Sequence, residues 1–194
     1  MEELVLIPKK YRCLSGSGLK VLAVVTMLID HIGATFPRST ASIILRIGRS
    51  RLMLYTVMRL IGRISFPIYA FLLVEGFLHT SNRERYGIRL ALFAILSELP
   101  WNLLHASAWR YETQNVFFTL LLGYLGLCLV EKIQTESGKD PKSIFLLLGT
   151  FVLASVLKAD YGSSGYGFIL MLYLLRRQPL FQAVVGACFL SSRW

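Results

Sequence analysis

The sequence predicts an all-α fold, a polytopic bundle of about six or seven transmembrane helices that forms a single domain over residues 1–194. Hydrophobic residues make up 55% of the 194 residues, and the mean hydropathy is +0.57. Only 16% of the residues are charged, whereas about 25% is usual in soluble domains. Because the apolar residues also form long runs separated by short polar joints, the composition and the pattern together favour a lipid environment.

The apolar runs are the predicted membrane helices, since a spanning helix needs about 20 mostly apolar residues. They cover residues 19–36, 54–78, 86–104, 115–131, 142–158, 165–175 and 179–190. The final run is short and stops close to Trp194, so we expect an incomplete or half-spanning element there. The run from Leu19 has no small-residue cleavage site behind it and carries Asp30 and His31. It is predicted to be a retained first helix and not a removed signal peptide.

Two segments are predicted to lie outside the hydrocarbon. Residues 1–17 are expected to form a cytoplasmic N-terminal segment. Residues 37–53 are expected to form an interfacial loop or helix, because Arg46, Arg49 and Arg51 alternate there with apolar residues. Lys and Arg are more frequent on the side that holds the N-terminus in this arrangement, which predicts a cytoplasmic N-terminus. The Arg-rich segment is the exception to this bias.

The basic residues and the cysteines exclude several other classes of protein. The formal net charge is +10, but the basic residues are spread between the apolar runs instead of forming one cluster. Cys13, Cys128 and Cys188 are far apart and odd in number, so they offer neither zinc spacing nor a disulfide framework. Motifs of nucleotide-binding loops, zinc proteases and serine hydrolases are absent from the sequence. We therefore expect no nucleic-acid partner and no metal ion.

Polar and charged residues inside the predicted helices are the candidate functional residues, since a charge near the bilayer centre costs about 2.5–3.5 kcal/mol on insertion scales. With a cytoplasmic N-terminus these side chains lie at similar depth, and pairs four residues apart share a helix face. They are Asp30, His31, Arg59, Arg63, Glu98, Asn102, Asn115 and Thr119, with Lys20 on the same face of the first helix as His31. We expect them to converge on one polar pocket.

His31 is the predicted general base of this pocket, because a neutral imidazole can take a proton from an amine or a hydroxyl. Asp30 is adjacent in sequence and points about 100° away along a helix, so Glu98 is the better candidate for orienting the imidazole. An Arg or amide side chain would stabilise a developing oxyanion. The alternative is a structural salt-bridge network in which Arg63 neutralises Asp30 or Glu98.

A second polar cluster surrounds the predicted loop between the second and third helices. It contains Glu75, His79, Asn82, Arg83, Arg85 and Arg89. Guanidinium groups bind phosphate oxygens through two parallel hydrogen bonds, so the cluster predicts a phosphate-binding site. The simpler alternative is the excess of basic residues that marks a cytoplasmic loop, although it gives no reason for the acidic Glu75.

Short motifs follow one another along residues 18–167. They are Gly18-Leu19-Lys20, Asp30-His31-Ile32-Gly33, the stretch from Arg59 to Phe71, Glu75-Gly76-Phe77, His79-Thr80-Ser81-Asn82, Ser97-Glu98-Leu99-Pro100-Trp101-Asn102, Asn115 to Thr119, and Ala159-Asp160-Tyr161-Gly162. In these residues the chain resembles the TraX family. The named member of that family N-acetylates the pilin of conjugative plasmids, and the family is grouped with the multi-pass membrane acyltransferases.

The resemblance implies transfer of an acetyl group from acetyl-CoA, as co-substrate, to an amine of a pilin or another peptide, or to a hydroxyl. It implies that His31 is the catalytic base with Asp30 as its companion, and that the Arg, Glu and Asn positions bind the thioester or the acceptor. The expected location is the bacterial cytoplasmic membrane. The residues alone leave two alternatives: a small proton-coupled transporter in which Asp30, His31 and Glu98 relay protons, and a structural subunit that only binds partners.

Overall fold

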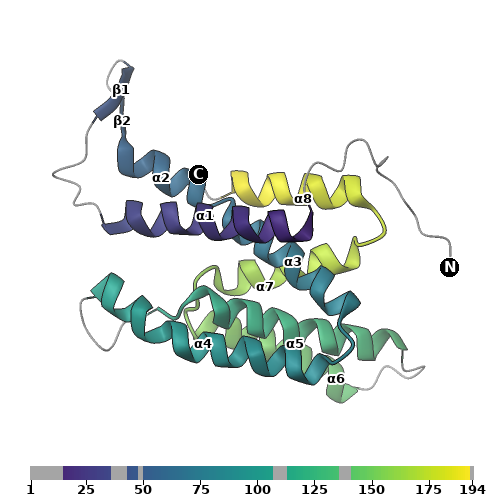
Figure 1. Cartoon of the computed structure of the whole chain (residues 1–194). Helices are drawn as coiled ribbons and strands as arrows, with labels where there is room; N and C mark the ends of the chain where they lie inside the picture. Colours follow the sequence, from purple (N-terminus) through teal and green to yellow (C-terminus); the bar gives the residue numbers. More distant parts are fainter. Residues whose placement is uncertain (1–14, 36–42, 48–49, 107–112, 136–140, 193–194) are drawn as a thin grey trace. The chain divides into compact units, whose positions relative to one another are not determined.

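The computed structural model describes residues 15–35, 43–47, 50–106, 113–135 and 141–192. In these residues the chain has eight helices and two short strands (Figure 1). They are α1 (Gly16–Thr35), β1 (Ile43–Ile47), β2 (Ser50–Met53), α2 (Leu54–Gly62), α3 (Ser65–His79), α4 (Arg83–Ala106), α5 (Val116–Thr135), α6 (Pro141–Val156), α7 (Gly162–Leu174) and α8 (Pro179–Ser191). The predicted helical fold is confirmed, and each predicted apolar run falls on helical structure.

Several helices have the length and surface that a membrane requires. Three segments among the described residues are long and apolar enough to span it, namely Gly16–Ala34, Leu54–His79 and Val116–Thr135. α4 has 24 residues and therefore also has the length, while α6 and α8 are shorter apolar helices. Large apolar side chains are widely exposed, for example 76% of Phe145 and 68% of Leu96. Such exposure suits contact with acyl chains, and the chain is a membrane protein.

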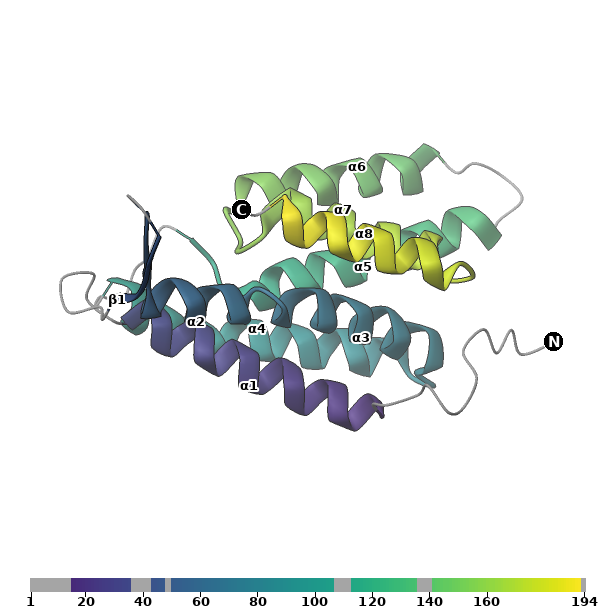
Figure 2. The same ribbon diagram turned by 90° about the horizontal axis from the view of Figure 1, so that it is seen from above.

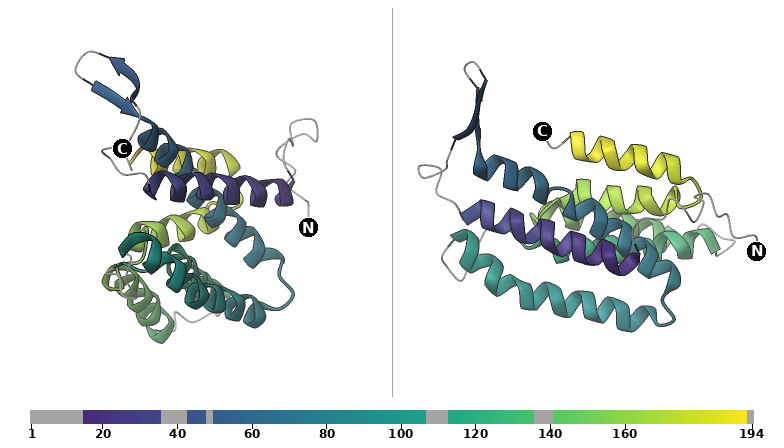
Figure 3. Two further views of the ribbon diagram at one scale, coloured as in Figure 1. Left: turned by 60° about the vertical axis from the view of Figure 1, so that its left-hand side comes forward. Right: turned by 45° about the horizontal axis from the view of Figure 1, so that its top comes forward.

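Residues 43–47 and 50–53 form an antiparallel strand pair, whereas the sequence predicted an interfacial loop or helix over 37–53. Ile43 pairs with Met53 and Ile47 with Ser50, and the two strands project from the start of α2 (Figure 3). The first strand is rich in isoleucine, a β-branched residue that favours strands, and Arg46 lies opposite Arg51 in the pair. Residues 37–42 and 48–49 lie outside the described residues, as do residues 1–14 of the predicted N-terminal segment.

The predicted helix over 54–78 consists of two helices, α2 and α3, with a turn at Arg63 and Ile64. Pro67 explains the interruption, because proline has no N–H group to donate to the carbonyl four residues earlier, here that of Arg63. Arg63 is the C-cap residue of α2, and its N–H group makes the last hydrogen bond of the helix, to the carbonyl of Arg59 at 3.2 Å. A basic residue within a long apolar stretch therefore sits at a helix junction.

The chain divides into two compact units. The first consists of Met1–Leu72 and Gly186–Trp194, and the second of Leu73–Val185. Both boundaries fall inside helices, α3 and α8, so no linker separates the units. The single domain expected from the sequence stays a prediction.

α5 is the central helix of the second unit, where it packs against α4, α6 and α7. The buried side chains of α5 and α7 form much of the core of this unit, including Leu120, Tyr124, Leu127, Tyr166, Ile169 and Leu172. Gly123 allows α5 and α7 to approach closely, because a Cβ atom at this position would overlap Ile169. The Tyr166 hydroxyl lies 2.8 Å from that of Thr150 on α6, so the buried polar group has a partner.

Candidate functional site

α1 carries the predicted catalytic pair, Asp30 and His31, near its C-terminal end. His31 Nδ1 lies 2.8 Å from the backbone carbonyl oxygen of Met27, one turn earlier in the helix. A carbonyl oxygen only accepts hydrogen bonds, so Nδ1 carries the proton and Nε2 holds the lone pair of the neutral ring. Nε2 is therefore the basic nitrogen of neutral His31.

Asp30 forms an ion pair with Arg59 of α2. The Asp30 side chain is 20% exposed and that of Arg59 is 45% exposed, so the pair is only partly shielded from its surroundings. Arg63 follows one turn after Arg59 and ends α2. In the salt-bridge alternative, Arg63 was the residue expected to neutralise Asp30 or Glu98. The structure shows that Arg59 neutralises Asp30, at least in part.

Two buried glycines allow α1 and α2 to approach closely around this ion pair. A Cβ atom at Gly62 would overlap the Asp30 side chain, and one at Gly33 would lie 2.8 Å from the Cβ atom of Met58. These contacts mean that the two helices run antiparallel, and they lie side by side in Figure 2. The Asp30 side chain is thus held between the Gly62 backbone and the Arg59 guanidinium.

Glu98 of α4 is joined to Asn115, the residue that precedes α5. Asn115 Nδ2 donates to Glu98 Oε2 at 2.7 Å and to the carbonyl of Ala94 at 2.8 Å. Asn115 also caps α5, because its Oδ1 accepts from the N–H of Phe117 at 3.0 Å. Asn115 is only 2% exposed, so this connection between α4 and α5 is buried. The role of Glu98 in orienting His31 stays a prediction.

The loop between α6 and α7 contacts the same end of α5. Buried Thr119 donates its hydroxyl to the carbonyl of Asp160, and the N–H of Asp160 donates to the carbonyl of Gln114 at 2.9 Å. Lys158 and Tyr161 have φ angles of 49° and 67°, in a region that residues other than glycine rarely occupy. Two strained residues beside a buried polar contact make this loop a candidate functional segment.

The predicted phosphate-binding cluster lies where α3 connects to α4, and its arginines have different surroundings. Arg83 forms an ion pair with Glu131 of α5, with Nη2 2.8 Å from Oε1. Its guanidinium carbon also lies 4.5 Å from the centre of the Phe77 ring. These contacts give Arg83 a structural role between α4 and α5. Arg85 and Arg89 are exposed one turn apart on α4.

The other members of this cluster are a helix cap and a pair on α3. Asn82 Oδ1 accepts the N–H of Arg85 at 2.8 Å and so caps α4. His79 Nδ1 lies 2.9 Å from the backbone carbonyl oxygen of Glu75 and 3.7 Å from its Oε2 atom. The His79 side chain is 76% exposed, so this pair lies at the surface of α3.

The predicted site residues therefore fall into three groups. The first unit holds Asp30, His31, Arg59 and Arg63, with exposed Lys20 near the start of α1. Glu98, Asn102, Asn115 and Thr119 lie at one end of the α4–α5 pair, and Asn102 is buried there. The third group lies at the connection between α3 and α4. Convergence of the first two groups on one pocket stays a prediction.

Sequence reasoning did not select two partners of these residues as site residues: Glu131, and Asp160, which it named only as part of a motif. Glu131 is acidic and lies near the end of an apolar run, so the criterion that selected Glu75 could also have found it. Asp160 accepts the Thr119 hydroxyl through its backbone carbonyl. A backbone contact of this kind has no signal in side-chain chemistry.

Comparison with known proteins gives one family and one curated relative. The profile of a family described as TraX protein matches residues 15–192. A relative from Dichelobacter nodosus, described as "Probable fimbrial assembly protein FimC, serogroup H1", is 32% identical over 123 residues. The match covers 59% of this chain and 46% of the relative, so the chain spans about half the length of that protein. No solved structure matches the chain.

Proposed function

The chain belongs to the TraX family, and from this membership we propose that it is a membrane acetyltransferase that uses acetyl-CoA. In this proposal it is a multi-pass protein of the bacterial cytoplasmic membrane. The acceptor is an amine at the N-terminus of a pilin or another peptide, and a hydroxyl acceptor would follow the same chemistry. The similarity to a probable fimbrial assembly protein supports a pilin as the acceptor.

The contact between His31 and Met27 is the observation that carries the catalytic part of the proposal. Because Nδ1 donates to the Met27 carbonyl at 2.8 Å, the basic nitrogen of the neutral ring is Nε2. A general base needs a defined lone pair in a fixed orientation, and the helix backbone supplies both. Asp30 supports this role in a second way, because its ion pair with Arg59 ties the catalytic end of α1 to α2.

The proposed reaction needs one proton transfer and one acyl transfer. His31 Nε2 takes a proton from the acceptor amine as the amine nitrogen attacks the carbonyl carbon of the thioester. The carbon–sulfur bond then breaks, and the CoA thiolate receives the proton from His31. The products are the acetylated amine and free CoA, and the imidazole returns to its neutral form.

The remaining predicted residues supply binding in this proposal. Exposed Arg85 and Arg89, with Asn82 and His79 beside them, bind the phosphate groups of CoA. Arg83 contributes less to this binding, because Glu131 already neutralises it. In this proposal the acceptor is bound by the group of residues at one end of the α4–α5 pair, which are Glu98, Asn102, Asn115 and Thr119.

Transfer measured directly tests the proposal. The purified protein in nanodiscs is incubated with acetyl-CoA and a peptide that has a free N-terminus, and the peptide is followed by mass spectrometry. We expect a mass gain of one acetyl group on the peptide amine and release of free CoA thiol. A protein that neither binds acetyl-CoA, measured as heat stabilisation in detergent, nor transfers its acetyl group would fit the transporter or the structural subunit instead.

The matched variant is His31→Ala, with His105→Ala as a control at a histidine outside the predicted site. Loss of a general base typically lowers turnover by about 10² to 10⁴. We expect kcat to fall by at least about 10² in His31→Ala while the thermal unfolding midpoint and acetyl-CoA binding are retained. Unchanged kcat in His31→Ala would remove His31 from the mechanism.

A further inference from the structure

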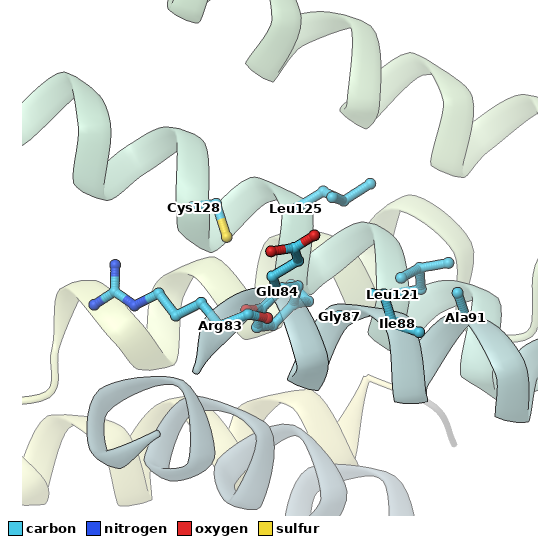
Figure 4. Close-up of a pocket in the computed structure, with 9 residues that line it drawn as sticks. Arg83, Glu84, Gly87, Ile88, Ala91, Leu121, Leu125 and Cys128 are labelled. Carbon is cyan, nitrogen blue, oxygen red and sulfur yellow. The ribbon is translucent and has the colours of Figure 1, made fainter. Parts of the chain in front are cut away.

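An open apolar groove lies between α4 and α5 in the second unit. Its volume is about 380 Å³. Gly87 and Ala91 line it from α4, and Leu121 and Leu125 line it from α5. Figure 4 shows these residues around the groove, with the Arg83 side chain extending away at one end.

The groove exists because small residues recur one turn apart on α4. Gly87 and Ala91 share a helix face, and they leave room where larger side chains would pack against α5. The Tyr124 ring forms the floor of the groove beside Gly87. A Cβ atom at Gly87 would lie 3.1 Å from the Cε1 atom of Tyr124. The Tyr124 hydroxyl donates to the carbonyl of Arg83 at 2.7 Å, which fixes the ring in that position.

The walls of the groove suit a hydrocarbon chain. Ile88 and Leu125, which line it, are 51% and 42% exposed. α5 is one of the segments long and apolar enough to span a membrane, and exposed apolar side chains of this kind suit contact with acyl chains. From Glu84 to Ala91 the groove follows two turns of α4, about 10 Å at 1.5 Å per residue. An acyl chain that lies parallel to the helices fits this shape and this lining.

Charges of both signs surround one end of the groove. Glu84 lines this end and is exposed, and it forms no ion pair with any residue that the structure describes. Arg83 is neutralised by Glu131, and Lys132 lies one turn beyond Cys128 on the same side of α5. With two carboxylates and two cations, this end does not favour a net anionic headgroup. A headgroup that has both a phosphate and an ammonium matches it.

We propose that the groove binds one phospholipid with a zwitterionic, primary-amine headgroup, its acyl chain against Gly87 and Ala91 and its ammonium group at the Glu84 carboxylate. An ethanolamine headgroup donates hydrogen bonds to the carboxylate, whereas a choline headgroup has no N–H group to donate. The lipid therefore bridges α4 and α5 beside the Arg83–Glu131 ion pair.

Native mass spectrometry of the full chain, released from nanodiscs that contain equal amounts of phosphatidylethanolamine, phosphatidylcholine and phosphatidylglycerol, tests this site. We expect one retained lipid, predominantly phosphatidylethanolamine. Ala91→Leu fills the groove and should weaken retention about tenfold, as expected for the displacement of two methylene groups. Gly149→Leu is the matched control, because a Cβ atom added there on α6 has no neighbouring atom within 4 Å, and it should leave retention unchanged.

A second variant tests the headgroup without changing the groove. Glu84→Gln should keep the bound lipid but lose the preference for phosphatidylethanolamine over phosphatidylcholine. Equal retention in Ala91→Leu and Gly149→Leu, or a wild-type preference for phosphatidylglycerol, would overturn the proposal. Both measurements are made without acetyl-CoA, so their outcome is independent of the proposed enzyme activity.

Discussion

The backbone of Gly62 lies directly against the side chain of Asp30, in a space where a methyl group would overlap that side chain. The Asp30 carboxylate reaches Arg59 from this position. The identity of residue 62 therefore decides whether α1 and α2 can hold the ion pair, although Gly62 carries no functional group itself.

Gly62→Ala should destabilise the protein by about 2 kcal/mol, because an added methyl group in a packed contact forces the helices apart. Gly149→Ala is the control, since nothing lies within 4 Å of a Cβ atom there. The control should gain up to about 1 kcal/mol from the better helix propensity of alanine. Unfolding in mixed detergent micelles measures both changes, and equal stability of the two variants would contradict the close contact.

The ion pair between Asp30 and Arg59 should appear as a coupling energy in a double-mutant cycle. Because Arg59 is 45% exposed, we expect a coupling of only about 0.5–1 kcal/mol from Asp30→Asn, Arg59→Gln and the double variant. If Asp30 also acts on His31, Asp30→Asn lowers acetyl transfer more than Arg59→Gln does. Additive stability changes would show that the pair contributes nothing to stability.

Asn115→Ala should cost about 3 kcal/mol, because it removes the cap of α5 and a buried donor to Glu98. Asn115→Asp keeps the cap but places a second carboxylate beside Glu98. Adding Glu98→Gln to Asn115→Asp should recover part of the lost stability, since the new amide can donate to the new carboxylate. The unfolding free energies of these variants in micelles give the comparison, and no recovery would argue against a direct contact.

Lys158→Gly should stabilise the loop between α6 and α7 by up to about 1 kcal/mol, because glycine adopts a positive φ without steric cost. Lys158→Ala is the matched control, since it shortens the side chain but keeps the Cβ atom that causes the strain. If the strain contributes to function, Lys158→Gly raises the thermal unfolding midpoint and lowers transfer activity. A glycine variant no more stable than the alanine variant would show that the strain at this position is negligible.

The helices could be predicted from the sequence because membrane insertion requires long apolar runs, and these mark α1 and α5 clearly. The junction between α2 and α3 was missed because hydropathy continues across it, although Pro67 was a local signal for it. The strand pair of residues 43–47 and 50–53 was missed because the arginines among apolar residues were interpreted as an interfacial surface. Over so short a segment, periods of 2 and 3.6 are difficult to distinguish.

The types of residue in the candidate site could be predicted from the sequence, but which charged side chains pair with one another could not. Asp30, Arg59 and Glu98 were predicted to be site residues because ionisable groups are costly to place in a membrane. Which Arg approaches Asp30 depends on how α1 and α2 are aligned, and Gly62 sets that alignment through a backbone contact. The pairing of Arg83 with Glu131 similarly joins residues 48 positions apart.

The contacts at the start of α5 also set an order of events during synthesis on the ribosome. The Asn115 side chain can form its hydrogen bonds to Glu98 and Ala94 as soon as α4 and the start of α5 have emerged from the ribosome. Thr119 and Gln114 bond to Asp160, which follows only after α6 has been translated. Until then, the newly inserted α5 lacks these hydrogen bonds at its first turn. A nascent chain halted before residue 160 should therefore be cleaved more readily by proteases at this end of α5 than a chain halted after α7.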